Sequence, residues 1–206
     1  MDPQEFVETV RDEAATPLSR LGSSKALYAD TAGEMEDGAV LRAAADRAHF
    51  AAETFEAWAD AESGDASELF ADAAETERSH ADAAADERGD YEPGDAPAVQ
   101  DHLRGVEGTV ERLGAFVGWA LAAGNNADQV VGYFVGQASP QTASTFRSFG
   151  DDYDDYVADG GDLLASVCGD DEWDDAIAAA TAAVEADYED YFETLESLGV
   201  NPKPVC

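Results

Sequence analysis

The sequence predicts an all-α protein, an antiparallel helical bundle of about seven helices. Apolar residues recur at intervals of three and four residues almost throughout the chain, whereas β-branched runs with strict alternation are absent. Glycine and proline gather between the periodic segments, where they end helices. A chain of 206 residues, 45% of them hydrophobic, is long enough to bury a core, and no long linker divides it. We therefore expect a single domain over residues 1–200 and an extended tail over residues 201–206.

The periodic segments place the helices, in order, at 3–31, 37–62, 66–88, 97–123, 127–137, 140–166 and 171–198. The breaks coincide with punctuating residues, among them Gly33, Gly64, Pro93 and Gly124. Ser139 followed by Pro140 predicts an N-cap with proline at the first helical position. Pro17 lies inside the first segment, where it either kinks the helix or begins a second one capped by Thr16.

The net charge of −35 comes from 46 acidic and 11 basic residues, and only Lys25 and Lys203 are lysines. Charges repel over about 10 Å at 0.1 M salt but over only about 3 Å at 1 M, so such a domain stays compact only in concentrated salt. The composition resembles that of proteins from halophiles that accumulate salt. We interpret the acidity as adaptation to the solvent and not as a site.

The composition also excludes several classes of partner. Binding to nucleic acid needs clusters of Lys and Arg, and the nine arginines are scattered among carboxylates. Anionic membranes are excluded on the same ground, no segment is apolar enough to span a bilayer, and the acidic N-terminus is unlike a signal peptide. We therefore expect a cytoplasmic protein with two reduced thiols, Cys168 and Cys206, while a disulfide between them and a homodimer stay open.

Glu77 and His80 are the most informative polar residues. On the expected helix 66–88, Glu77 lies at the centre of the apolar stripe, seven residues from both Phe70 and Ala84, and His80 shares that face. A carboxylate and an imidazole one turn apart that point into a bundle are the arrangement by which di-iron helical bundles hold metal. The pair predicts a site for iron or another divalent metal.

Four further side chains are candidate ligands. Asp46, His49 and Glu53 share the expected helix 37–62, but His49 lies far from its apolar arc, which favours a solvated face. His102 lies at the edge of the apolar stripe of helix 97–123, where it is either a third ligand or a hydrogen-bonded histidine at the border of the core.

Lys25 provides a rival to the metal hypothesis. It falls on the apolar face of the expected helix 3–31, and burying an ammonium alone costs several kcal/mol. Lys25 therefore either reaches water or meets a carboxylate, for which Glu77 is the best candidate. A structural Lys25–Glu77 pair is then the alternative to a metal site. The catalytic residues stay unknown, because the chain has no phosphate-binding loop and no nucleophile elbow.

The N-terminal part of the chain resembles the rubrerythrin branch of the ferritin-like superfamily. Residues 22–28, Gly-Ser-Ser-Lys-Ala-Leu-Tyr, are similar to the first-helix motif of that family, in which Gly-Glu-Ser precedes Ala and Tyr. In this register Asp46 and His49 stand at the Glu-x-x-His motif of the family. The first ligand of the family falls on Ser23, which does not replace a carboxylate.

A second register places Glu53 with Glu77 and His80 as one half of a di-iron site. The other half lacks its histidine, because no histidine follows His102. The resemblance therefore implies a ferritin-like bundle with an altered, mononuclear or lost metal site, and, where metal is bound, redox chemistry on peroxide or oxygen.

The helix count and the Tyr- and Glu-rich final helix also resemble the heme-oxygenase-like fold of thiaminase-II-type proteins. That resemblance implies a pocket for a small aromatic molecule, here lined by Tyr28, Tyr188, Tyr191 and Cys168. The bundle as a non-catalytic structural or interaction protein is the third alternative.

Overall fold

The structure is a computed structural model that describes residues 1–88, 91–169 and 171–202. Within these ranges all regular secondary structure is helical, which confirms the predicted all-α class, and the helices form a bundle. The nine helices of the described ranges are α1 (Pro3–Glu13), α2 (Ala15–Leu21), α3 (Ser24–Asp30), α4 (Asp37–Ala61), α5 (Asp65–Arg88), α6 (Ala98–Arg104), α7 (Thr109–Gly136), α8 (Pro140–Val167) and α9 (Trp173–Ser197).

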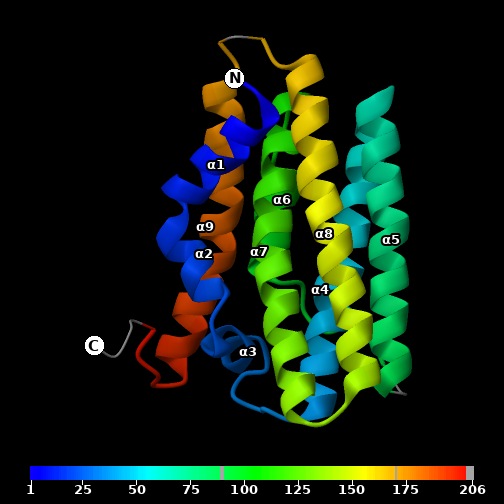
Figure 1. The fold of residues 1–206 in the computed structure, drawn as a ribbon, viewed down its shortest axis with the longest axis vertical. Coiled ribbons are helices and arrows are strands. Elements are labelled where there is room, and N and C mark those ends of the chain that lie inside the picture. The colour runs from blue at the N-terminus through cyan, green and yellow to red at the C-terminus, as the bar shows by residue number, and fades with distance from the viewer. Residues whose placement is uncertain (89–90, 170, 203–206) are drawn as a thin grey trace.

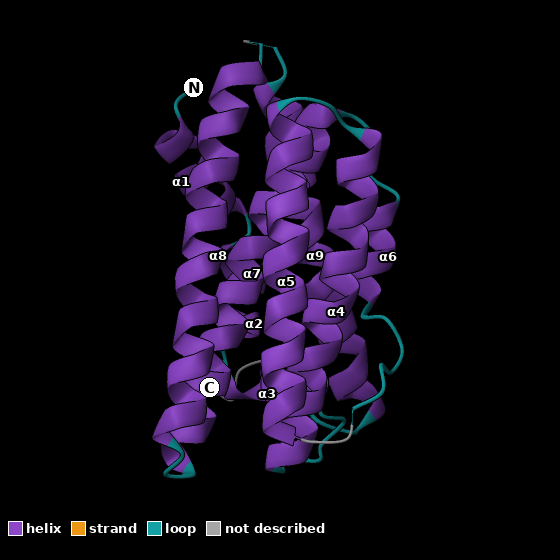
Figure 2. Cartoon of the chain, turned by 90° about the vertical axis from the view of Figure 1, so that its right-hand side faces the viewer, coloured by secondary structure: helices purple, strands orange, loops and turns teal. Residues whose placement is uncertain are grey.

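Five long helices, α4, α5, α7, α8 and α9, lie along the long axis of the molecule (Figure 1). The helices α4 and α5 form one antiparallel pair, and α7 and α8 form another. The chain between α5 and α7 returns along the side of the bundle and includes α6, so α5 and α7 run in the same direction (Figures 1 and 2). The helix α9 packs on α7, and the short helices α1 to α3 contact α7, α8 or α9.

The prediction of one continuous helix over residues 3–31 is wrong, because the segment forms three helices. Pro17 is the third residue of α2, in the first turn, where a missing N–H costs nothing. The residue before α2 is Ala14 and not the predicted cap Thr16. At Ser23 the backbone is extended and the hydroxyl donates to the carbonyl of Arg20 at 2.7 Å. The break at Ser23 gives α3 a direction of its own, at the lower end of the bundle (Figure 1).

The predicted helices 97–123 and 127–137 are also wrong in their boundaries. The first divides after Arg104, and α7 begins beyond Gly108, whose φ of 90° favours glycine. The expected break at Gly124 is absent, because α7 continues to Gly136. The side-chain amides that follow Gly124 donate hydrogen bonds to other helices: Asn125 donates to the carbonyl of Leu18 at 3.1 Å and Asn126 to Asp30 at 2.6 Å. Tertiary contacts here outweigh the local preference for a turn.

The remaining predicted helices agree with α4, α5, α8 and α9 to within two residues at each end. Ser139 and Pro140 begin α8 as predicted, although the Ser139 side chain makes no capping hydrogen bond. None of the described helices is long and apolar enough to cross a membrane. Lys203 and Cys206 lie outside the described residues, so the extended tail and the Cys168–Cys206 disulfide stay predictions.

The helix α7 lies at the centre of the core. Every residue from Leu113 to Ala122 is buried, and the ring of Phe116 packs against four aromatic neighbours, including Phe55 and Phe70. A Cβ atom added at Gly114 or Gly118 would overlap the backbone carbonyls of Ala176 and Ala180 on α9. Glycine is therefore required at two points where α7 and α9 touch through their backbones.

Gly118→Ala is expected to lower the free energy of unfolding by between about 1 and 3 kcal/mol, because the methyl group forces α7 and α9 apart. Urea denaturation in molar KCl, monitored by circular dichroism, measures this change.

Gly132→Ala is the matched control on the same helix. A Cβ there meets nothing within 4 Å, so the variant is expected to gain about 0.5–1 kcal/mol from the helix preference of alanine. Equal effects of the two substitutions would contradict the backbone contact between α7 and α9.

Candidate functional site

The side chains of Glu77 and His80 point from α5 into the bundle, as the stripe of apolar residues predicted. Glu77 is completely buried and His80 is 3% exposed. They face α8, which brings Phe149, Asp152 and Tyr156 to them. Two helices that are distant in sequence thus build one polar cluster in the core, and we call Glu77, His80 and Asp152 the acid–imidazole chain.

The imidazole of His80 lies between the two carboxylates. Its Nε2 is 2.8 Å from Oδ2 of Asp152, a hydrogen bond. Its Nδ1 is 3.2 Å from Oε1 of Glu77, close enough for an ion pair but not aligned for a hydrogen bond. The Asp152 side chain is 42% exposed, so the acid–imidazole chain extends from the buried Glu77 to the solvent.

Glu77 has few other partners. The hydroxyl of Tyr156 donates weakly to Oε1 of Glu77 at 3.3 Å, and Oε2 has no hydrogen-bond partner among the described residues. A buried carboxylate oxygen without a partner is costly in its charged form.

Aromatic rings enclose the imidazole. The ring of Phe149 stacks on His80 with centroids 3.8 Å apart, and the edge of Tyr153 approaches it at 5.6 Å. These contacts hold the ring of His80 in one orientation and keep water from its faces.

Burial raises the pKa of Glu77, although the neighbouring His80 opposes this shift. Burial acts to lower the pKa of His80, but the adjacent carboxylate groups of Glu77 and Asp152 and the hydrogen bond to Asp152 outweigh it, so the pKa of His80 is raised. Burial also raises the pKa values of Tyr153 and Tyr156, which stay neutral at ordinary pH. Both members of the Glu77–His80 pair therefore hold protons more strongly than in water.

The donor geometry does not fit a di-metal centre. Glu77 and Asp152 lie at opposite nitrogens of His80, so one ion cannot take all three as ligands. Among the described residues no group of three His, Cys, Asp or Glu side chains is arranged to hold a metal ion. A ferritin-like centre needs inward carboxylates from four helices.

The other predicted ligands do not join Glu77 and His80. Asp46 instead accepts from the Tyr91 hydroxyl at 2.7 Å and from the backbone of Gly94 at 3.0 Å. His49 lies 3.7 Å from Glu53 on a partly exposed face of α4.

Glu53 also pairs with Arg104 at 3.1 Å, so the solvated-face interpretation of α4 agrees with the structure. His102 lies on α6, which packs against α4 and α9, and its Nε2 is buried without a described partner.

The predicted Lys25–Glu77 pair does not form. Lys25 donates to the carbonyl of Asn201 at 2.7 Å, while Glu77 contacts His80 and Tyr156. The prediction is wrong because it assumed one continuous helix over residues 3–31. The extended backbone at Ser23 ends that continuity, so the residues of α3 face in other directions than the helical period predicted.

The predicted aromatic pocket is not assembled either. Tyr188 and Tyr191 stack at 5.7 Å, and the Tyr191 hydroxyl reaches the carbonyl of Pro202. Cys168 precedes α9, and Tyr191 lies 18 residues into α9, a separation of about 27 Å along its axis. Tyr28 lies on α3 and its ring packs over Gly33, in the turn that follows the helix.

The sequence analysis missed a second buried carboxylate. Asp187 of α9 accepts hydrogen bonds from both terminal nitrogens of Arg47 of α4 at 2.9–3.0 Å, and Asp30 lies 3.9 Å from the same guanidinium. Burial raises the pKa of Asp187 to about 6 even beside Arg47. The signal was present, because Asp187 falls between Val184 and Tyr191 on the apolar seam of the last helix.

No known protein family matches the sequence, and neither a curated protein nor a solved structure matches the chain.

The stability of the fold is expected to decrease as the pH rises above about 4.3, the ordinary pKa of a glutamate. Because the folded-state pKa values of Glu77 and His80 are both raised, the folded chain holds more protons above the ordinary values of about 4.3 and 6.5. Their contribution is complete at low pH and is lost as the pH passes through the folded-state values. Urea denaturation in molar KCl at a series of pH values measures it.

Glu77→Gln should flatten this pH dependence, since it removes one group and the charge that raises the pKa of the other. Asp187 contributes with the same sign in both proteins, so the difference between wild type and Glu77→Gln isolates the acid–imidazole chain. An unchanged slope in the variant would contradict the proton binding described here.

Proposed function

We propose that this protein is a ferritin-like helical bundle that has lost its di-metal centre and keeps the Glu-x-x-His half of it as a metal-independent acid–base site. The topology supports the first part, because two antiparallel pairs joined by one long crossover are the connectivity of ferritin-like bundles. Glu77 and His80 on the inner face of α5 support the second.

The observation that carries the proposal is what lies opposite Glu77. The interior beside it is filled by rings: Tyr156 contacts Glu77, and Phe116 and Trp119 pack on Tyr156 at 5.2 Å and 6.3 Å. In a di-metal bundle the facing helices place carboxylates at this depth. Here α7 and α8 supply aromatic side chains instead, and among the described residues Glu77 and His80 gain no third donor for a common ion.

The same geometry supports acid–base work. His80 bridges a buried carboxyl group and a partly exposed carboxylate, so it accepts a proton on the Asp152 side and presents one to Glu77. The aromatic walls shield Glu77 from water and keep its pKa high. The interior thus exchanges a proton with the solvent through one histidine.

Metal analysis tests the loss of the di-metal centre. Protein purified in molar KCl without a chelator or a histidine tag is expected to contain less than a tenth of an equivalent of iron, manganese or zinc, and to take up no added Fe(II). One equivalent or more of tightly bound metal that disappears in Glu77→Ala and persists in His49→Ala would overturn the proposal.

Proton NMR of the imidazole tests the acid–base site. His80 is expected to titrate above the ordinary value of about 6.5, and Asp152→Asn to lower its pKa, because Asp152 stabilises the imidazolium. The resonances of His49 on α4 and His102 on α6 serve as internal controls. A His80 that titrates identically in Asp152→Asn would show that the two groups do not exchange a proton as proposed.

A further inference from the structure

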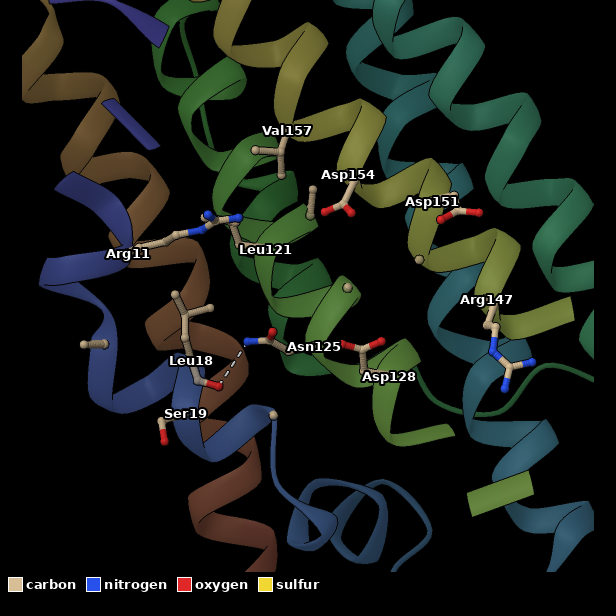
Figure 3. Close-up of a pocket in the computed structure, with 15 residues that line it drawn as sticks. Arg11, Leu18, Ser19, Leu121, Asn125, Asp128, Arg147, Asp151, Asp154 and Val157 are labelled. Atoms are coloured by element: carbon tan, nitrogen blue, oxygen red, sulfur yellow. Dashed lines mark hydrogen bonds between the residues drawn. The ribbon is translucent and has the colours of Figure 1, made fainter. Parts of the chain in front are cut away.

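A groove of about 790 Å³ opens between the N-terminal helices α1 and α2 on one side and α7 and α8 on the other (Figure 3). It contains neither Glu77 nor His80, and it lies on a different face of α8. Pockets that bind small molecules are typically about 300–1,000 Å³ in volume, so the groove is large enough for one.

Two arginines in this groove have no acidic partner. Arg47, Arg78, Arg104 and Arg112 each form an ion pair, as expected in a chain with 46 carboxylates. Arg11 and Arg147, which line the groove, form none with any residue that the structure describes. A guanidinium offers up to five donors in a planar fork that matches a carboxylate, so Arg11 presents an open anion-binding group.

Acidic side chains in the groove are likewise unpaired. Asp128 on α7 and Asp154 on α8 make no hydrogen bond or ion pair within the described ranges. Figure 3 shows Arg11 extended from α1 toward α7, with the carboxylates of Asp154 and Asp128 across the groove from it. The groove thus presents both signs of charge without pairing them to each other.

Apolar side chains also line the groove. Leu18, Leu121 and Val157 contribute side chains to it. The amide of Asn125 is held by the carbonyl of Leu18, which ties α2 to α7 beside the groove (Figure 3). At Gly150 a Cβ would meet nothing within 4 Å, so this residue keeps the α8 side of the groove open.

The groove lining selects among ligands. In molar salt charges act over only about 3 Å, so the groups that line the groove matter more than the net charge of −35. A molecule that carries one charge of each sign can pair with both kinds of charged group in the groove, whereas a simple cation has many other carboxylates to bind. We propose that the groove binds a zwitterionic small molecule of about dipeptide size, with its carboxylate on Arg11, its ammonium on Asp128 and Asp154, and its apolar body over Leu18, Leu121 and Val157.

The dipeptide leucyl-leucine is a suitable probe, with binding followed by ¹⁵N chemical shifts of the whole protein in molar KCl. We expect saturable shifts in residues that line the groove, and at least a tenfold weaker affinity for N-acetyl-leucyl-leucine and for leucyl-leucine amide, each of which lacks one charge. Absence of saturable binding, or equal affinity for the three probes, would overturn the proposal.

Variants locate the site. Arg11→Gln should weaken binding at least tenfold, whereas Arg42→Gln, which removes another arginine without an ion pair outside the groove, should not. Gly150→Leu fills the groove without changing charge and should abolish binding, while Gly132→Leu adds the same side chain to α7 away from the groove. Binding that survives Gly150→Leu would place the ligand elsewhere.

The result is separable from the acid–base proposal. Glu77→Gln leaves the groove intact and should bind leucyl-leucine like the wild type. If leucyl-leucine does not bind, the acid–base proposal is unaffected. If the acid–base proposal fails, the groove proposal is likewise unaffected.

Discussion

The close contact between α7 and α9 is the constraint on which the rest of the structure depends. Gly114 and Gly118 let the backbone of α7 reach that of α9 at Ala176 and Ala180. With α9 this close, α7 is covered along its whole central part and becomes the axis of the bundle. The other long helices then take their places around it, and α8 packs against both α7 and α5. Dispersion contacts are lost steeply when such helices separate, which is why glycine is required at both positions.

The position of α8 determines the chemistry of the interior. Its aromatic face, with Phe149, Tyr153 and Tyr156, turns toward α5 and encloses Glu77 and His80. The rings take the volume that further ligands would need, and they also remove water from the carboxyl group. Desolvation therefore converts a potential metal ligand into a group that keeps its proton. The same packing explains both the raised pKa of Glu77 and the absence, among the described residues, of three His, Cys, Asp or Glu side chains arranged to hold a metal ion.

Charged groups are compensated differently in the core and at the surface of the protein. Within the described ranges two carboxylates are buried, Glu77 and Asp187. Asp187 is compensated by the guanidinium of Arg47, and Glu77 by a proton and by His80. At the surface, the groove holds two guanidinium groups, those of Arg11 and Arg147, that have no carboxylate partner among the described residues although acidic residues also line it.

The sequence by itself determined the helical class, four of the five long helices to within two residues, and the inward direction of Glu77 and His80. Periodicity carries this information, because it depends only on neighbours within a few turns. Tertiary structure decided the rest. Contacts of Asn125 and Asn126 with α2 and α3 keep α7 continuous past Gly124, and the break at Ser23 sends Lys25 to Asn201 and not to Glu77. Asp152 as the partner of His80, the pairing of Arg47 with Asp187, and the groove beside Arg11 each join segments about 70 to 140 residues apart. No local pattern encodes such distances, because they depend on how whole helices pack.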